Sequence, residues 1–136
     1  MPDSEPPAPR KRRILIVDDE PGVVMSLSYL LSAEFGYDVV TANNGMAGLE
    51  IAAKGDVDLM LLDFDMPHFN GHGVLHALSA EPLLSKIPVV MITGRATKDV
   101  RQSSLLAGAR EVVSKPFDIH SLKSTILRHL PPEANQ

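Results

Sequence analysis

A chain of 136 residues, 44% of them apolar, is long enough for one domain with a single hydrophobic core. It has no cysteine, which excludes disulfides and cysteine-based zinc sites, and its formal net charge of −4 disfavours nucleic acid as a direct ligand. No apolar run approaches the length needed to span a membrane, so we expect a small cytoplasmic domain that contacts neither nucleic acid nor membrane.

The first part of the chain differs in composition from the rest. Four of the first nine residues are prolines and no apolar periodicity is present, which is typical of a disordered segment. We therefore expect a disordered lead-in over residues 1–11, a folded domain over 12–131 and a flexible tail over 132–136. These polar ends favour a complete small protein, although a domain cut from a longer chain remains the alternative.

Two kinds of sequence segment alternate along the folded part of the chain. Short aliphatic runs predict strands at residues 14–17, 38–42, 59–62, 88–92 and 111–113. Helical spacing or composition predicts helices at residues 21–35, 45–54, 71–81, 97–107 and 119–130. Strict alternation of strand and helix indicates right-handed βαβ units and a parallel sheet covered on both faces. The predicted fold is a doubly wound α/β domain with five strands and five helices.

Polar residues follow four of the five predicted strands. These strand ends read Asp18-Asp19-Glu20, Asp63, Thr93-Gly94 and Ser114-Lys115-Pro116. In an open parallel sheet, ligands bind at the carboxyl ends of the strands, so these side chains are expected to meet at one edge. Carboxylates gathered in this way are compensated by a hard divalent cation with oxygen ligands, and Mg²⁺ fits best because it uses few carboxylates and bridges to phosphate oxygens.

This set of residue types indicates phosphoryl transfer. Asp63 is the candidate nucleophile that would accept the phosphoryl group. Lys115 would supply a positive charge for the new phosphate and Thr93 a hydroxyl donor. No serine–histidine–aspartate grouping, Walker loop or G-x-G-x-x-G motif competes with this interpretation.

The segments ILIVDDEP, LMLLDFDMPHFNG, PVVMITG and SKPF, in this order, resemble the receiver domain of two-component response regulators of the chemotaxis-regulator type. The resemblance extends from Arg13 to Leu130. It implies a flavodoxin-like sheet with strand order 2-1-3-4-5. It also implies a signalling domain that receives phosphate from the phosphohistidine of a histidine kinase or phosphotransfer protein, loses it slowly by hydrolysis, and is not a turnover enzyme.

The resemblance also assigns roles to individual residues. By it, Asp63 is the phospho-acceptor, Thr93 the switch hydroxyl and Lys115 the phosphate-binding lysine, followed by a cis bond to Pro116. The Mg²⁺ ligands would be Asp18, Asp19, Asp63 and the backbone carbonyl of Asp65. The downstream target is expected on the surface of the fourth helix, fifth strand and fifth helix, with the protein a monomer or weak dimer.

Three features depart from what the family pattern leads us to expect, one of them the segment PHFNG, where the family often has a Gly and then an acidic residue before the second Gly. Family members usually carry an aromatic residue three positions before the lysine, where this chain has Val112, which has no ring to turn towards Thr93. We hypothesise that signalling relies instead on the loop after Thr93, or is partly lost. Gly94, directly after Thr93, is a small residue that leaves the acceptor open to water.

Two alternatives remain. The D-x-D pair at Asp63 and Asp65 also occurs in haloacid-dehalogenase-like phosphatases, but Met66-Pro67 replaces the residues expected there, and the acidic pair Asp18-Asp19 precedes the nucleophile instead of following the lysine. The second alternative is a degenerate receiver that acts as an interaction module without phosphorylation. The histidines His72, His76, His120 and His129 are interpreted as solvated helix residues.

Overall fold

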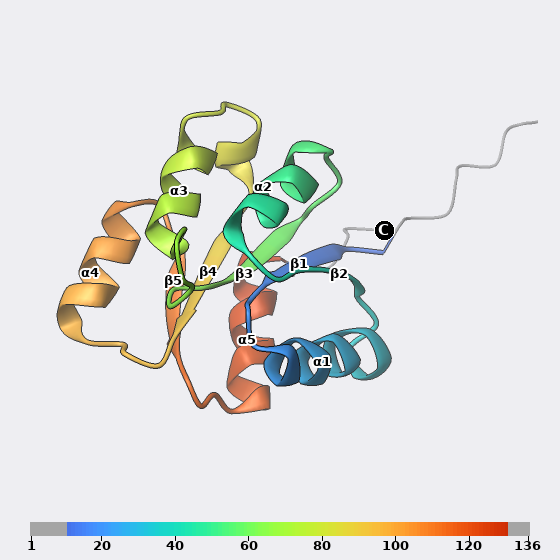
Figure 1. Ribbon diagram of the computed structural model, residues 1–136. Helices are drawn as coiled ribbons and strands as arrows, with labels where there is room; N and C mark the ends of the chain where they lie inside the picture. Colours follow the sequence, from blue (N-terminus) through green and yellow to red (C-terminus); the bar gives the residue numbers. More distant parts are fainter. Residues whose placement is uncertain (1–10, 131–136) are drawn as a thin grey trace, which may run out of the picture.

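A five-stranded parallel sheet forms the centre of the computed structural model, which describes residues 11–130 (Figure 1). The strands are β1 (Arg13–Val17), β2 (Asp38–Ala42), β3 (Leu59–Asp63), β4 (Val89–Thr93) and β5 (Glu111–Ser114). Their order across the sheet is β2-β1-β3-β4-β5, and every neighbouring pair is parallel. The predicted flavodoxin-like order is confirmed.

Five α-helices cover the two faces of this sheet. They are α1 (Pro21–Tyr29), α2 (Gly45–Ala53), α3 (Gly71–Ser79), α4 (Lys98–Leu106) and α5 (Ile119–His129). Figure 1 shows α2, α3 and α4 on one face, with α1 and α5 on the other. The result is the three-layer arrangement expected of right-handed βαβ units.

The predicted helices and strands agree with the observed ones to within a few residues, with two differences. The first predicted helix ends as α-helix at Tyr29 and continues as a π-helical segment over Leu30–Glu34, where the N–H of Phe35 bonds the carbonyl of Leu30 at 3.1 Å. A short 3₁₀ turn, Leu84–Lys86, follows α3 and was not predicted. Apolar spacing alone does not distinguish one helical hydrogen-bond pattern from another.

The core consists of two apolar clusters, one on each face of the sheet. One cluster joins β1, β3 and β4 to α2 and α3, and the other joins the opposite faces of the same strands to α1 and α5. All five residues of β3 and of β4 are buried. This burial explains why the central strands are continuously apolar in sequence, since both their faces lie inside the protein.

Side-chain caps begin four of the helices soon after a strand ends. The side chains of Asn44, Asn70, Thr97 and Asp118 accept hydrogen bonds from backbone N–H groups in the first turns of α2, α3, α4 and α5. Such caps satisfy N–H groups that have no partner within the helix. They fix where each helix starts and therefore hold the connecting loops over the carboxyl edge of the sheet.

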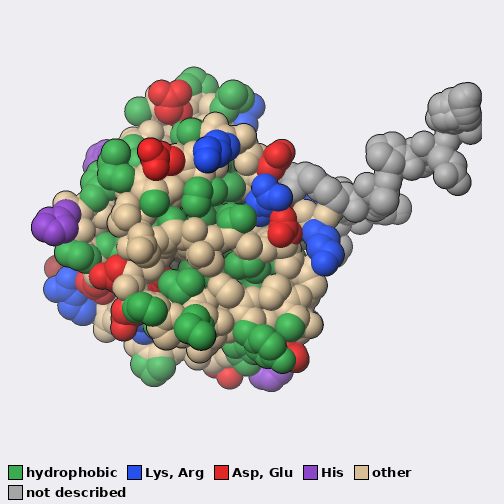
Figure 2. Space-filling view, turned by 45° about the vertical axis from the view of Figure 1, so that its right-hand side comes forward, with side chains coloured by type: hydrophobic (Ala, Val, Ile, Leu, Met, Phe, Trp, Pro, Cys, Tyr) green, Lys and Arg blue, Asp and Glu red, His purple; other side chains and the backbone are tan. Residues whose placement is uncertain are grey.

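Acidic and basic side chains are interspersed on the face shown in Figure 2. Ion pairs of this kind tie the start of β1 to its neighbours, where Arg13 Nε lies 2.7 Å from Asp38 Oδ2. Within residues 11–130, every helix is too short or too polar to cross a membrane. The predictions of a disordered lead-in and a flexible tail fall almost wholly outside the described residues.

Candidate phosphoryl-acceptor site

The carboxyl edge of the sheet brings together most of the residues singled out from the sequence. Asp63 ends β3, Thr93 ends β4, and Asp18 and Lys115 directly follow β1 and β5. The backbone continues the strand pairing here, since the N–H of Lys115 bonds the carbonyl of Thr93 at 2.8 Å. The peptide bond between Lys115 and Pro116 is cis, as the resemblance implies.

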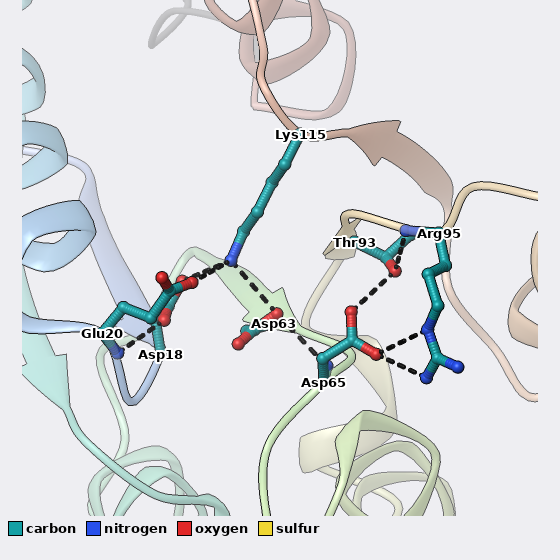
Figure 3. A network of polar contacts seen from close by, with 7 residues as sticks. All are labelled: Asp18, Glu20, Asp63, Asp65, Thr93, Arg95 and Lys115. Carbon is teal, nitrogen blue, oxygen red and sulfur yellow. Dashed lines mark hydrogen bonds and ion pairs between the residues drawn. The ribbon is translucent and has the colours of Figure 1, made fainter.

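Lys115 lies at the centre of three carboxylates (Figure 3). Its Nζ is 3.0 Å from Glu20 Oε1, 3.3 Å from Asp18 Oδ2 and 3.4 Å from Asp63 Oδ1. The Asp18 and Asp63 side chains are only 3% and 1% exposed, so their charges are removed from water and need this partner. A lysine from β5 therefore holds the acids of β1 and β3 in one group.

Burial and like charge both act on the candidate acceptor. Burial raises the pKa of Asp63 to about 6, and the neighbouring Asp18 carboxylate adds to this, while Lys115 and the backbone N–H of Asp65 act in the opposite direction. Burial acts to lower the pKa of Lys115, but its hydrogen bond to Glu20 and the charges of Asp63 and Asp18 raise it overall. At neutral pH Lys115 is a cation and Asp63 is mostly a carboxylate.

The carboxylates fit a small hard cation. Oxygens of Asp18, Glu20 and Asp63 lie within 4.8 Å of one another, close enough to share one ion. Excess negative charge around a single lysine is the condition that a divalent cation relieves, and oxygen ligands are those that Mg²⁺ prefers. The predicted ligand Asp19 is exposed and is not in this group. The predicted contribution of the Asp65 carbonyl stays a prediction.

The carboxylate of Asp65 has more contacts than the sequence suggested. Thr93 Oγ1 donates to Asp65 Oδ2 at 3.0 Å and accepts from the backbone N–H of Arg95 at 3.0 Å. The Arg95 guanidinium donates to Asp65 Oδ1, with Nη2 at 2.7 Å. Burial acts to raise the pKa of Asp65, but the hydrogen bonds from Arg95 and Thr93 lower it overall. The Asp65 carboxylate therefore connects the Thr93 hydroxyl to an arginine, a role that the sequence did not suggest.

Val112 occupies the position where the family pattern has an aromatic residue. It is 6% exposed, lies in register with Met91 of β4 and packs in the cluster below α2 and α3. Its carbonyl accepts a hydrogen bond from Arg101 Nη1 of α4 at 3.0 Å. The side chain has no polar atom and no ring with which to follow Thr93.

The interpretation of all four histidines as solvated is wrong for two of them. His72 is half-buried, with Nε2 3.1 Å from Ser104 Oγ of α4 and its ring edge-on to Phe64. His129 Nε2 lies 2.9 Å from Glu111 Oε1. Both belong to helices that pack on the domain, and a helical pattern in sequence does not say which polar residue finds a partner. His76 and His120 are exposed as expected.

Glu20 and Arg95 were missed as site residues. Glu20 is the third acid of the Asp18–Glu20 run, directly after β1, and its position was visible but was given no role. Arg95 stands two residues after Thr93, as Asp65 stands two residues after Asp63. This equal spacing after two neighbouring parallel strands was the signal that could have paired them.

Comparison with known proteins agrees with this geometry. The family described as "Response regulator receiver domain" matches residues 14–127. The chain belongs to this family. It is a receiver domain of the two-component response regulators, and the alternative of a haloacid-dehalogenase-like phosphatase does not hold.

The receiver is similar to both small and multidomain proteins. It is 33% identical to sporulation initiation phosphotransferase F of Bacillus subtilis over 90% of this chain and 97% of that protein. It is 38% identical to a probable cyclic di-GMP phosphodiesterase of Vibrio cholerae over 86% of this chain, but spans only 26% of that relative. The crystal structure of the chemotaxis protein CheY4 of Vibrio cholerae superposes with a TM-score of 0.83 at 28% identity, covering 89% of this chain and all of CheY4.

Proposed function

We propose that this receiver accepts a phosphoryl group from the phosphohistidine of a partner kinase or phosphotransfer protein onto Asp63, in a magnesium-dependent reaction. Slow hydrolysis then returns the carboxylate, so that the domain works as a timed switch that docks onto a target. The protein is best regarded as a signalling domain that catalyses its own modification, acting in the cytoplasm.

The observation that carries this proposal is the group formed by Lys115, Asp63, Asp18 and Glu20. Three of its members come from the ends of three different strands or the residues next to them, and Lys115 contacts all three acids. A structural ion pair needs one acid for one lysine. Three acids around one lysine, two of them buried, favour a site that takes up further positive charge and an anion together.

The chemistry follows from the positions of these atoms. A carboxylate oxygen of Asp63 attacks the phosphorus of the phosphohistidine, the P–N bond breaks, and the imidazole nitrogen keeps the electron pair and takes a proton. The product is an acylphosphate on Asp63. Lys115 then pairs with a phosphoryl oxygen, and the Thr93 hydroxyl donates to another. In hydrolysis, water attacks the phosphorus and inorganic phosphate leaves.

Magnesium would be held by Asp63, Asp18 and a further acid, and it would supply the charge that neutralises the transferring phosphoryl oxygens. Two residues are candidates for this further acid. Glu20 lies in the same group as Asp18 and Asp63, and Asp19 is the ligand that the family pattern predicts. The backbone carbonyl of Asp65 is the remaining proposed ligand. The acidic cluster supports Mg²⁺ as the cofactor because it offers carboxylate oxygens, the kind of ligand that this ion prefers.

The docking surfaces are proposed from exposure. An open hollow beside Lys115, lined by Val23, Leu27 and Phe117, lies next to the acceptor and suits a donor protein. On α4, Leu105 and Leu106 are 50% and 83% exposed, which supports target docking on the surface of α4, β5 and α5. A monomer or weak dimer is proposed for the oligomeric state.

The alternative of a degenerate receiver has little in its favour. The acceptor, its lysine and the switch threonine are all present, and the structure gathers them at one edge of the sheet. Val112 changes the route by which the signal leaves the site but leaves the acceptor chemistry intact.

Labelling with acetyl phosphate tests the proposal. The wild-type protein with Mg²⁺ should gain the mass of one phosphoryl group, and omission of Mg²⁺ or addition of EDTA should abolish the gain. Asp63→Asn should not be labelled, whereas Asp56→Asn, which alters an exposed acid in the loop before β3, should be labelled like the wild type. Unlabelled wild-type protein, or equal labelling of Asp63→Asn, would refute Asp63 as the acceptor.

A further inference from the structure

Because position 112 has no aromatic ring, this chain lacks the side-chain link between Thr93 and the outer surface that the family pattern provides. Val112 is buried, aliphatic and fixed through its carbonyl to Arg101. A change at Thr93 therefore needs another set of contacts to reach the outer surface. The described residues contain one such set beside Thr93, and it begins with the Asp65–Arg95 pair (Figure 3).

A continuous row of contacts leads from Arg95 to α4. The Arg95 guanidinium carbon lies 5.9 Å from the centre of the Phe64 ring, within the range of a cation–π contact. The Phe64 ring meets His72 edge-on, with 4.9 Å between ring centres. His72 Nε2 lies 3.1 Å from Ser104 Oγ, and Ser104 is a fully buried residue of α4. The row thus joins the loops after β3 and β4 to α3 and then to α4.

The hydrogen bond from Thr93 to Asp65, which leads into this row, depends on the state of Asp63. A threonine hydroxyl carries one hydrogen and can donate to one acceptor at a time. In the unphosphorylated protein Thr93 donates to Asp65 Oδ2. When it donates to a phosphoryl oxygen on Asp63, the Asp65 carboxylate loses that donor but keeps those of Arg95 and the backbone N–H of Gly94, so its Oδ2 can turn away from Thr93.

The position of Arg95 follows that of Asp65. The Arg95 side chain is 71% exposed, so little of it is packed against the protein. Its position is set by its contacts with the Asp65 carboxylate and the Phe64 ring. Because Arg95 is hydrogen-bonded to this carboxylate, rotation of the carboxylate would carry the guanidinium with it and change its distance from the Phe64 ring. Phe64, which directly follows the acceptor in the chain, can then change its contact with His72, and His72 its contact with Ser104.

We propose that Arg95 is the positioning residue that transmits phosphorylation of Asp63 from Thr93 to α4, through Phe64 and His72, in place of the missing ring at Val112. This inference rests on the function proposed above. Contacts in a row show which groups touch, and their coupling is established by measuring the response of one end when the other is changed.

Amide chemical shifts of ¹⁵N-labelled protein, recorded with excess acetyl phosphate and Mg²⁺ and again without donor, provide that measurement. In the wild type, phosphorylation should shift amides beside Asp63 and Lys115 and also those of α4. In Arg95→Ala the shifts beside Asp63 and Lys115 should persist, while those over residues 98–106 fall by at least about threefold, within the range by which one contact modulates coupling. Arg95→Lys keeps the charge without the planar fork and should recover part of the response.

Two further variants complete the test. Arg110→Ala, which removes an exposed arginine just after α4, should keep the full wild-type response. His72→Phe keeps a ring against Phe64 but removes the contact to Ser104, and it should lose the α4 response as Arg95→Ala does. If the wild type takes up no phosphoryl group, the proposed function and this inference both fail. If Arg95→Ala is phosphorylated and α4 responds fully, or if Arg110→Ala loses as much response, only the transmission through Arg95 is refuted.

Discussion

The buried carboxyl group of Asp63 should make the protein less stable as the pH rises towards neutrality. Burial raises the pKa of Asp63 to about 6 from an unfolded value near 3.8, so the folded state binds its proton more tightly than the unfolded state. Between these two pH values the folded protein holds more protons than the unfolded chain, and stability falls with increasing pH. Well above pH 6 the full cost is present, about 3 kcal/mol at most, at 1.36 kcal/mol for each unit by which the pKa is raised.

Asp63→Asn removes this cost. Urea unfolding in EDTA should show the variant to be more stable than the wild type at pH 7 by about 1–3 kcal/mol, with the difference shrinking towards pH 4. Lys115 keeps Asp18 and Glu20 as partners in the variant. A stability difference that is constant across this pH range, or a less stable variant at pH 7, would contradict the raised pKa.

The lifetime of the phosphorylated state should depend on Gly94. A Cβ added there meets no heavy atom within 4 Å, and its backbone does not have the positive φ that only glycine tolerates well. The structure therefore accepts a side chain beside Thr93, where it would shield the acceptor from water. Gly94→Val should slow loss of phosphate from Asp63 roughly two- to tenfold, a change of about 0.4–1.4 kcal/mol in the barrier.

Single-turnover dephosphorylation, followed by intact mass after removal of the donor, measures this rate. Gly94→Ala adds only a methyl group and should lie between the wild type and Gly94→Val. A lifetime unchanged in both variants would mean that water reaches the phosphoryl group by another route.

At the residue scale the sequence was informative where a side chain belongs to a strand end. Asp63, Thr93 and Lys115 could be placed together because parallel strands align their carboxyl ends. The ring contact of Arg95 with Phe64 and the hydrogen bond of His72 to Ser104 could not, because they depend on rotamers and on how two helices pack. The choice between Asp19 and Glu20 beside Lys115 likewise depends on how the loop after β1 turns.

At the scale of the elements, the packing of α5 on the sheet depends on one acid of β5, Glu111. Glu111 accepts hydrogen bonds from Thr125 Oγ1 at 3.2 Å and Arg128 Nη2 at 2.6 Å, and its other oxygen faces His129. Burial acts to raise the pKa of Glu111, but the bonds from Arg128 and His129 lower it overall. A carboxylate with a lowered pKa stabilises the fold above its unfolded pKa, and this contribution is lost as the pH falls through the folded value.

Glu111→Gln should therefore destabilise the protein at pH 7 by about 1–2 kcal/mol, the usual cost of weakening a partly buried hydrogen-bonded ion pair. The difference from the wild type should decrease as the pH is lowered below 4.5. Glu50→Gln, at an exposed position of α2, is the matched control and should change stability little. Equal effects of the two substitutions in urea unfolding would show that the Glu111 cluster is not specifically stabilising.

At the element scale, the strands and helices were predicted from alternation and apolar spacing because two-sided burial leaves a continuous apolar run in β3 and β4. The π-helical end of the first helix escaped prediction. Within this segment Leu31 is fully buried, and Gly36, two residues after its end, has a φ of 79°. Such adjustments of helix pitch leave the apolar spacing almost unchanged.

At the scale of the whole molecule, the excess of negative charge at the carboxyl edge of the sheet should couple the stability of the protein to magnesium. Two buried aspartates and Glu20 surround a single lysine, so a cation that binds the folded state stabilises it by RT ln(1 + [Mg²⁺]/Kd). At a concentration ten times Kd this amounts to about 1.4 kcal/mol.

Thermal unfolding with and without Mg²⁺ should show this increase for the wild type and for Glu50→Gln. Asp18→Asn keeps the shape and an acceptor for the N–H of Glu20 but removes one charge, and it should lose most of the magnesium effect. Because Asp18→Asn also relieves repulsion with Asp63, the variant should be at least as stable as the wild type in EDTA, so a loss of the magnesium effect cannot be attributed to misfolding. An equal increase for Asp18→Asn would place the bound ion elsewhere on the molecule.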